Sequence, residues 1–324
     1  MSYPLHRRFI EKDIEDGSEQ HPFLIKTAGD FQDFRNAIAA GNQFEGIYHK
    51  VVNDINLAEI SFNPLPSTNN PITHYKGHFN GNFKTISNFS VTTNAVQNAA
   101  IFGSTMGGSI KKTKFTNMYI KFSGGGSSDV GCVAGHVANE LIELCEFHGT
   151  IISNGQWATG GIIASCWGGN VTVKNCKTNL IVQTALQTGG IIATPSGSNI
   201  TIESCLTLGT ASGGNASNGG ICMDRTSTTT IKNCVAAQSS ISGSSGAARI
   251  VGGSSGSIIN NYALDTMLVN GNIVTGSVTS NHGANATVQQ LKSLAFYRDM
   301  MGWDMDIWTI DDGIDFPRLK GFNY

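Results

Sequence analysis

The motif Gly160-Gly161-Ile162 recurs almost unchanged at Gly189-Gly190-Ile191 and at Gly219-Gly220-Ile221. Looser copies of this motif end at Ile101, Val133 and Ile250. From one copy to the next the steps are 32, 29, 29, 30 and 29 residues. A fixed period of about 20 to 50 residues is typical of solenoids and propellers. The sequence therefore predicts a stack of similar structural units.

A second motif follows later in each unit, where an Ile or Val stands three residues before a Cys. It is found at Ile142/Cys145, Val173/Cys176, Ile202/Cys205 and Ile231/Cys234. Phe115 and Tyr262 take the slot of the Cys at the two ends of this series. Stacking would place these residues in one column inside the coil, where a free Cys packs as a small hydrophobe. Metal binding or disulfide bonding is less favoured, because no Cys-x-x-Cys spacing occurs.

The charges two positions before this column alternate from unit to unit. The residues there are Thr113, Glu143, Lys174, Glu203, Lys232 and Asn260. On adjacent strands opposite charges contribute roughly 0.2 to 1 kcal/mol, whereas like charges repel. We therefore expect a structural ladder of ion pairs, which explains these carboxylates without catalysis.

Each unit consists of short alternating β-branched runs, such as Val171-Thr172-Val173 and Ile200-Thr201-Ile202, bounded by Gly, Ser and Asn. No helical period accompanies them, and a unit is too small for the four strands of a propeller blade. The composition agrees, with 39 Gly and only 14% charged residues. We predict an all-β fold, a single-stranded right-handed parallel β-helix, with a small N-terminal helical cap and a C-terminal cap.

The two ends of a β-helix expose strand edges and apolar core, so both need a cover. Near the start, Phe23-Leu24-Ile25 reads as a strand and residues 30–40 as a helix with Phe31, Phe34, Ile38 and Ala39 on one face. Near the end, residues 291–301 read as a helix stopped by Gly302, and an aromatic-rich segment follows. We expect the two segments to close the two ends of the coil.

Four regions follow from this reading of the chain. They are a polar N-terminal segment that serves as an anchor to a larger assembly (1–22), an N-terminal cap with an irregular first coil (23–97), the β-helix repeats (98–288) and the C-terminal cap (289–324).

The chain resembles the GLUG-motif family of parallel β-helix proteins, which occurs in bacterial surface adhesins and in related phage proteins. The resemblance rests on Gly77-His78-Phe79-Asn80-Gly81-Asn82-Phe83, on the Gly-Gly-Ile coils, and on Gly302-Trp303-Asp304 with Phe316-Pro317-Arg318-Leu319 near the end. It implies the β-helix fold and is nearly silent about activity. The sequence departs from the usual Leu-Val-Gly of the family at Ile162-Ile163-Ala164.

Several classes of partner are disfavoured. A net charge of -2 without a basic run argues against nucleic acid. No stretch of 18 apolar residues is present for insertion into a membrane. Residues 1–22 are rich in charge and contain no apolar core of a signal peptide, which favours a virion component over an exported adhesin.

The residues that polysaccharide chemistry requires are sparse. Between residues 151 and 290 the acids are Glu203, Asp224 and Asp265, and these residues do not supply the pair of carboxylates that a glycosidase requires. No Gly-x-Ser-x-Gly elbow lies between a strand and a helix, and the eight His residues form no His-x-x-x-His pair. We expect no catalytic residues, no metal and no cofactor.

Binding is the more promising role. Trp157 and Trp167 stand five residues before and five after Ile162, where exposed aromatic rings would stack on sugars. Asp224 and Arg225 form a charged pair on a nearly neutral stretch. The alternatives are that both Trp residues pack over a corner of the coil or against another subunit, and that Asp224 and Arg225 form a local ion pair.

The sequence therefore predicts a non-enzymatic attachment or structural protein, a phage virion fibre, spike or decoration protein that recognises a cell-surface glycan or receptor. It would assemble with other virion or surface proteins. The sequence does not decide whether it also forms homo-oligomers. One alternative is an adhesin module on the bacterial surface. Another is a polysaccharide-degrading β-helix enzyme, a glycosidase or lyase.

Overall fold

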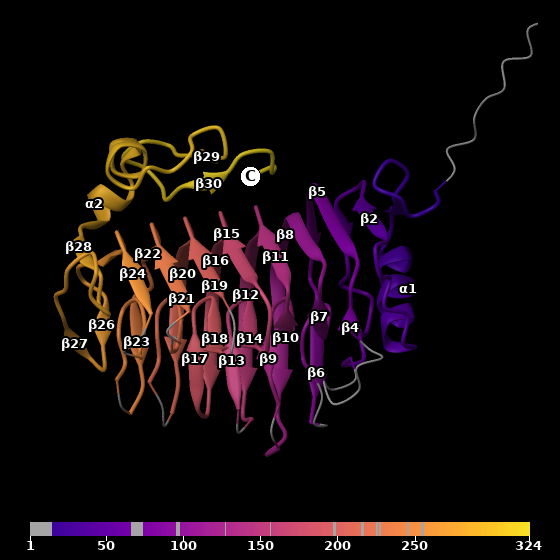
Figure 1. Ribbon diagram of the computed structural model, residues 1–324, viewed down its shortest axis with the longest axis horizontal. Coiled ribbons are helices and arrows are strands. Elements are labelled where there is room, and N and C mark those ends of the chain that lie inside the picture. Colours follow the sequence, from indigo (N-terminus) through magenta and orange to yellow (C-terminus); the bar gives the residue numbers. More distant parts are fainter. Residues whose placement is uncertain are drawn as a thin grey trace, which may run out of the picture.

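The computed structural model shows a parallel β-solenoid of about eight turns, with about 8% of the residues in helices (Figure 1). This confirms the predicted parallel β-helix. The structure describes residues 15–65, 74–94, 98–126, 128–155, 157–196, 199–214, 217–224, 226, 228–244, 246–253 and 256–324.

One coil contains four strands separated by short turns. In the coil of Ile162 these are β13 (Ala158–Gly160), β14 (Ile163–Cys166), β15 (Val171–Lys174) and β16 (Lys177–Thr184). In β15 the side chains alternate between buried and half-buried, because Val171 and Val173 point into the coil. β13 and β14 are instead buried along their whole length.

Strands at the same place in successive coils form long parallel ladders. The first ladder contains β1 (Phe23–Ile25), β2 (Tyr48–Val51), β5 (His78–Ser87), β8 (Ser109–Phe122), β11 (Glu140–Glu143), β15, β19 (Ile200–Glu203), β21 (Thr229–Lys232) and β24 (Ser257–Ile259). The second ladder shares β5 and β8 and adds β3 (Ile55–Asn56), β6 (Ser90–Thr93), β12 (Glu146–Ser153), β16, β20 (Leu206–Ser212), β22 (Val235–Ala236), β23 (Ser240–Ser242), β25 (Tyr262–Leu264), β26 (Leu268–Val269) and β28 (Ala284–Ala286).

Two shorter ladders lie on the side of the Gly-Gly-Ile motifs. One contains β9 (Val130–Gly131), β13 and β17 (Gln187–Gly189). The other contains β4 (His74–Tyr75), β7 (Ser104–Met106), β10 (Ala134–Ala138), β14 and β18 (Ile192–Pro195). Near the end of the solenoid β26 also pairs antiparallel with β27 (Asn272–Ile273).

The two glycines of the Gly-Gly-Ile motif have separate steric roles. A Cβ on Gly160 would lie 1.7 Å from the carbonyl oxygen of Ile163 in its own coil. A Cβ on Gly161 would lie 2.0 Å from the carbonyl oxygen of Gly190 in the next coil. The first glycine therefore permits the tight turn between β13 and β14, and the second permits the coils to stack. The same two roles recur at Gly189 and Gly190, which explains the repeat.

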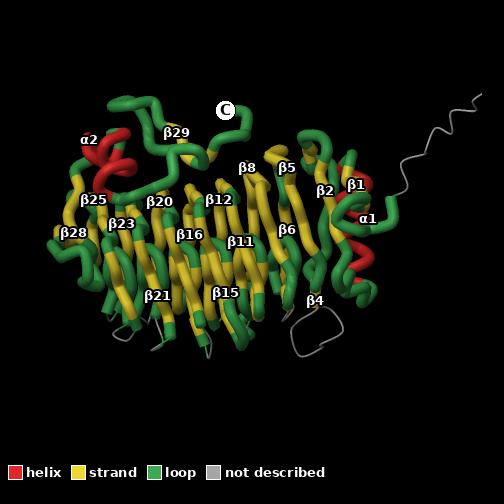
Figure 2. Tube along the Cα trace, turned by 45° about the horizontal axis from the view of Figure 1, so that its top comes forward, coloured by secondary structure: helices red, strands yellow, loops and turns green. Residues whose placement is uncertain are grey.

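At the start of the solenoid, α1 (Ala28–Ala39) covers the first coils (Figures 1 and 2). Thr27 and Asp30 form a capping box at its N-terminus. Phe31, Phe34 and Ile38 are buried as predicted. The prediction for Ala39 was wrong, because Ala39 is exposed and the buried position on that face belongs to Arg35.

The coil stack begins earlier than the sequence indicated. Strand β1 already pairs in register with β2, and β2 with β5, while the pairing of β5 with β8 contains a register shift between Asn80 and Lys84. Within the predicted anchor, residues 1–14 lie outside the described residues. Glu15 accepts a hydrogen bond from the Leu24 amide (2.9 Å) and pairs with Lys26, which ties the described part of that segment to β1.

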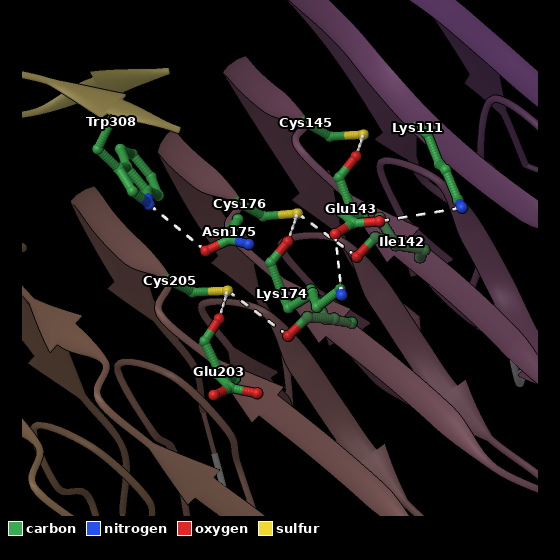
Figure 3. Close-up of polar contacts among 11 residues, drawn as sticks. Lys111, Ile142, Glu143, Cys145, Lys174, Asn175, Cys176, Glu203, Cys205 and Trp308 are labelled. Atoms are coloured by element: carbon green, nitrogen blue, oxygen red, sulfur yellow. Dashed lines mark hydrogen bonds and ion pairs between the residues drawn. The ribbon is translucent and has the colours of Figure 1, made fainter. Parts of the chain in front are cut away.

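The predicted column of cysteines is present inside the coil (Figure 3). Cys145, Cys176, Cys205 and Cys234 are fully buried and free of disulfides. Each thiol donates to the carbonyl of the residue two positions earlier, at 3.2 to 3.3 Å. Burial raises the pKa of the Cys176 and Cys234 thiols. These cysteines therefore act as small, buried core residues.

The residues predicted at the two ends of this column were wrong. Phe115 pairs with Phe147, and their rings stack at 6.0 Å, so the slot beside Cys145 belongs to the buried Thr113. Thr113 therefore lies in the column itself and does not precede it. At the other end Tyr262 pairs with Val235, so the slot after Cys234 belongs to Asn261.

The alternating charges form the expected ladder on the outside of the coil. Glu143 pairs with Lys174 (2.9 Å) and lies 3.9 Å from Lys111, and Glu203 pairs with Lys232 (3.0 Å). Figure 3 shows the first group from β8, β11 and β15. At the start of this ladder of charges the residue that pairs with Glu143 is Lys111, and not Thr113 as predicted. These side chains are partly exposed, so each pair contributes at most about 1 kcal/mol.

The C-terminal segment takes a different course from the predicted cap. It begins with α2 (Val288–Leu291), a π-helical turn η2 (Phe296–Met300) and Gly302, so the predicted helix is broken at Lys292 and Ser293. It then folds back along the side of the coils rather than closing their end (Figure 1). We call residues 287–324 the strap.

The strap contacts one coil after another along the second ladder. Trp303 Nε1 donates to the Asn233 carbonyl (2.8 Å), and Phe322 packs against Phe83, with ring centroids 5.3 Å apart. Its antiparallel pair β29 (Trp308–Thr309) and β30 (Arg318–Leu319) lies above β15 and β16 (Figure 1). No helix among the described residues has the length and apolar character needed to span a membrane.

Candidate functional site

The tight turn at each Gly-Gly-Ile motif folds two strands of one coil into an arch. Residues seven positions apart in the sequence face each other across this arch. An example is Asp129, which directly precedes β9, and His136, which lies in β10. Register pairing places Ala158 and Ser165 at the same positions of the next arch, and Gln187 and Thr194 at those of the arch after it. The arches therefore carry a row of polar side chains that hydrophobic patterning does not require.

Asp129 and His136 form the centre of this row. His136 Nε2 lies 2.6 Å from Asp129 Oδ2, and both residues are at most 9% exposed. The other oxygen of Asp129 accepts from Ser165 Oγ (3.1 Å) and, at 3.4 Å, from the Ala158 amide. The carboxylate thus orients the imidazole with Nε2 as the donor, and in the neutral ring Nδ1 is then the acceptor.

Trp167 lies directly beside this buried pair. Its ring meets the His136 ring edge to face, with centroids 4.5 Å apart at 90°. The indole is nevertheless 58% exposed. Its amide donates to the Val137 carbonyl (3.0 Å), so backbone and side chain are both held by the previous coil. The result is an exposed aromatic plane with a fixed orientation.

A pocket of about 180 Å³ opens next to this plane, and we call it the Trp167 pocket. It is lined by His74, Thr105, Met106, His136, Val137, Ala138 and Trp167. No Asp, Glu, Lys or Arg is among these lining residues. Among the described residues His136 Nδ1 has no hydrogen-bond partner, although it is buried. The pocket therefore fits a small uncharged group that presents a hydroxyl and an apolar face.

Of the other predicted binding residues, Trp157 and Asp224 do not line this pocket. Trp157 is 48% exposed and directly precedes β13, on the same arch as Trp167. Asp224 is exposed. The bridge between Ile192 and Cys222 sets the register, so Asp224 follows Thr194 in the row that begins with His136 and Ser165. Arg225 lies outside the described residues.

The arch contains the three side-chain types of a serine hydrolase, but their arrangement differs from a catalytic triad. A nucleophilic Ser must bond to the His and reach the substrate. Ser165 is fully buried and donates to Asp129 instead of His136. Among the described residues no group of three His, Cys, Asp or Glu side chains is placed to hold a metal ion. The geometry favours positioning of Trp167 over acyl transfer.

Sequence reasoning identified Trp167 but missed the residues that orient it. The signal was present in the repeat, because His136 and Ser165 each stand three residues after the Ile or Val of their motif. Asp129 stands four residues before Val133, at the position that Ala158 takes in the next unit. Polar residues at buried positions of two successive repeats would have indicated this network.

A buried carboxyl follows the same strand. Glu140, at the start of β11, is 3% exposed, and its Oε2 accepts one long hydrogen bond from the Gly108 amide (3.3 Å). Burial raises its pKa to about 8. The folded protein therefore holds a proton that the unfolded chain loses in the ordinary acid range, and stability falls as the pH rises from that range toward 8.

We expect Glu140→Gln to raise the apparent melting temperature at pH 8 and to change it little at pH 5. The neutral amide removes a penalty on the order of 3 kcal/mol, which exists only where the unfolded carboxyl is ionised. Circular dichroism melting curves at the two pH values measure the difference. Glu59→Gln, at an exposed site, is the matched control. Equal shifts at both pH values would contradict the assignment.

Comparison with known proteins supports the fold and gives no information on function. No family model and no curated protein sequence matches the chain. A crystal structure of a "putative immunoglobulin A1 protease" from Bacteroides ovatus is similar, with a TM-score of 0.68 and 22% sequence identity over 94% of each chain. At that identity the likeness shows a shared architecture over nearly the whole length, and it leaves the role of the Trp167 pocket to the chemistry of its own residues.

Proposed function

We propose that this protein is a non-enzymatic attachment protein that binds an uncharged cell-surface glycan at the Trp167 pocket. One observation carries the proposal: an indole that is 58% exposed is held in place by the buried Asp129–His136 pair. Most Trp residues are largely buried, so an exposed and braced ring calls for a ligand. Sugar rings present C–H faces to aromatic planes and hydroxyls to acceptors such as His136 Nδ1.

The setting that we propose is a phage virion, where the protein would serve as a fibre, spike or decoration protein among other virion proteins. A bacterial surface adhesin is the alternative. The lining of the Trp167 pocket holds no Asp, Glu, Lys or Arg, which supports an uncharged glycan as the ligand in either setting. Mass spectrometry of purified particles and of outer cell fractions would separate the two settings.

We expect Trp167→Ala to weaken binding to immobilised host glycans by at least about tenfold, because the variant removes the aromatic plane. The measurement is the dissociation constant on a panel of glycans, with circular dichroism as the check on folding. Tyr119→Ala is the matched control, since Tyr119 is an exposed aromatic residue of β8 on another ladder. Trp157→Ala tests whether the second indole shares the ligand.

The enzyme alternative has a direct test in the same system. Incubation of the protein with host polysaccharide should leave the chain length unchanged in size-exclusion chromatography. Depolymerisation that disappears in Asp129→Asn would overturn the non-enzymatic form of the proposal. Unchanged glycan binding by Trp167→Ala would overturn its site.

A further inference from the structure

A second cavity lies on another side of the molecule, between the strap and the coils. Its volume is about 780 Å³, and its walls come from β8, β12, β16 and β20 on one side and from the end of the strap on the other. Figure 1 shows this part of the strap above the strands, away from the arches of β10 and β14. We call it the strap cavity. It shares no lining residue with the Trp167 pocket.

Positive charge is concentrated in this cavity. Three cations, Lys114, Lys177 and Arg318, line it together with one acid, Asp315, and Arg318 also pairs with Asp311 outside the lining. Lys114 and Lys177 are each only 7% exposed. Burial lowers the pKa of both lysines, and the charge of Arg318 lowers it further, while Glu146 opposes the effect. Neighbouring buried cations repel one another, and a bound anion would relieve this repulsion.

The nearest buried carboxylate, Glu146, is bonded to three other donors. Glu146 Oε1 accepts from the Leu319 amide (3.2 Å) and from the Tyr324 hydroxyl (2.5 Å), and Oε2 is bonded to His148 Nε2 (3.2 Å). Two of these three bonds, from the Leu319 amide and the Tyr324 hydroxyl, hold the strap, and the charge of Glu146 also acts on Lys114 and Lys177. The lysine ammonium groups retain donors, since each has three.

Each of these lysines is held by one carbonyl of the strap. Lys177 Nζ donates to the Pro317 carbonyl (2.9 Å), and Lys114 Nζ donates to the Asn323 carbonyl (3.4 Å). Lys114 Nζ also lies 3.9 Å from the centroid of the Tyr324 ring. These contacts fix the two ammonium groups at the cavity wall. Arg318 Nε is buried there without a hydrogen-bond partner among the described residues.

The remaining lining supplies apolar and neutral polar contacts. Phe316 and Leu208 offer apolar surface, and Asn179 and Ser239 offer uncharged hydrogen-bonding groups. An inorganic anion would use only the cations. A ligand with a carboxylate, several hydroxyls and an apolar ring face would use all three kinds of group. The volume lies within the range of ordinary small-molecule sites, about 300 to 1,000 Å³.

We propose that the strap cavity binds a small acidic saccharide, with its carboxylate held by Lys114, Lys177 and Arg318. The site is independent of the glycan proposed at the Trp167 pocket, which is uncharged. Its ligand contacts the strap and the coils together, so the bound saccharide stabilises the attachment of the strap.

The test is isothermal titration of the full chain with glucuronate, with glucose and with sulfate. Glucuronate should bind at millimolar concentration or better, and glucose and sulfate should each bind at least tenfold more weakly. Equal binding of glucose would overturn the role of the cations. Equal binding of sulfate would overturn the saccharide. Absence of glucuronate binding would overturn the site.

Variants locate the binding. Arg318→Gln and Lys114→Met should each weaken glucuronate binding at least tenfold, and either result alone is informative if the other variant fails to fold. Lys320→Met is the matched control, because it removes one charge from an exposed position of the same strap. Trp167→Ala should leave glucuronate binding unchanged, so failure of one proposal is distinguishable from failure of the other. A loss in Lys320→Met equal to that in Arg318→Gln would overturn the site.

Discussion

A Gly160→Ala variant should lose about 3 kcal/mol or more of stability, because the added methyl group meets a carbonyl of the backbone. The new Cβ would lie 1.7 Å from the Ile163 oxygen, in a turn that is closed by the coils on both sides. A flexible side chain would move away from such a contact, whereas a backbone carbonyl in a packed ladder can yield only if the arch opens. We expect a drop of the melting temperature by several degrees, together with faster hydrogen exchange in β13 and β14.

The matched control for this variant is Gly125→Ala. No heavy atom lies within 4 Å of the position that its Cβ would take, so its melting temperature should stay close to that of the parent protein. The same steric argument predicts a large loss for Gly219→Ala, whose Cβ would lie 1.7 Å from the Cys222 oxygen. An unchanged melting temperature in Gly160→Ala would refute the explanation of the Gly-Gly-Ile motif.

The second large effect concerns the strap. We expect Glu146→Ala to destabilise the attachment of the strap by about 3 to 5 kcal/mol, because the change leaves a buried cation without its counter-charge. Glu146 is fully buried and bonds to His148, to Tyr324 and to the Leu319 amide, with Lys177 nearby. Limited proteolysis should cut the strap much faster in this variant, while circular dichroism still reports folded coils.

Glu143→Ala provides the comparison for this variant. It removes a carboxylate three residues earlier, from the partly exposed ion pairs with Lys111 and Lys174, where about 1 kcal/mol or less is at stake. Cleavage of the strap should stay near the parental rate. Equal cleavage in Glu146→Ala and Glu143→Ala would show that burial of the carboxylate does not matter for the strap.

The attachment of the strap should also depend on pH. Burial acts to raise the pKa of Glu146, but the hydrogen bonds from His148 and Tyr324 and the charge of Lys177 hold that pKa below its ordinary value. A depressed pKa means that the carboxylate contributes stability above its ordinary pKa and loses it as the pH falls through the lower, folded value. Acid should therefore release the strap, and proteolysis across the acid range measures the release.

The stacking of the coils could be predicted from the sequence because like positions repeat at a nearly constant step. Cys145 to Cys234 and Glu143 to Lys232 lie in the columns that the spacing indicated. The ends of the cysteine column could not be predicted from residue type. Thr113 is small and buried like a Cys, and Asn261 is buried because its amide bonds to the Ile231 carbonyl (2.8 Å) and to the Cys234 amide (2.8 Å).

The candidate sites were less accessible to sequence reasoning for a related reason. The pairing of Asp129 with His136 depends on how sharply the arch folds, and hydrophobic patterns do not report that angle. The path of the strap depends on where its aromatic residues find partners. Trp308 packs beside Trp303 and donates a hydrogen bond to Asn175, which directly follows β15 on the side of the coils. An amphipathic pattern alone would fit that surface and the open end of the solenoid equally well.

The course of the strap changes how the solenoid should unravel. In a linear array of repeats each unit holds only its neighbours, so such arrays fray progressively from an end. Here Trp303 engages the coil of Asn233 while Phe322 reaches Phe83, several turns away. Distant turns are thereby joined by one segment, and a turn at the edge cannot peel off without breaking contacts made elsewhere. Such a molecule should resist pulling along its axis as one body and give way in a single cooperative step.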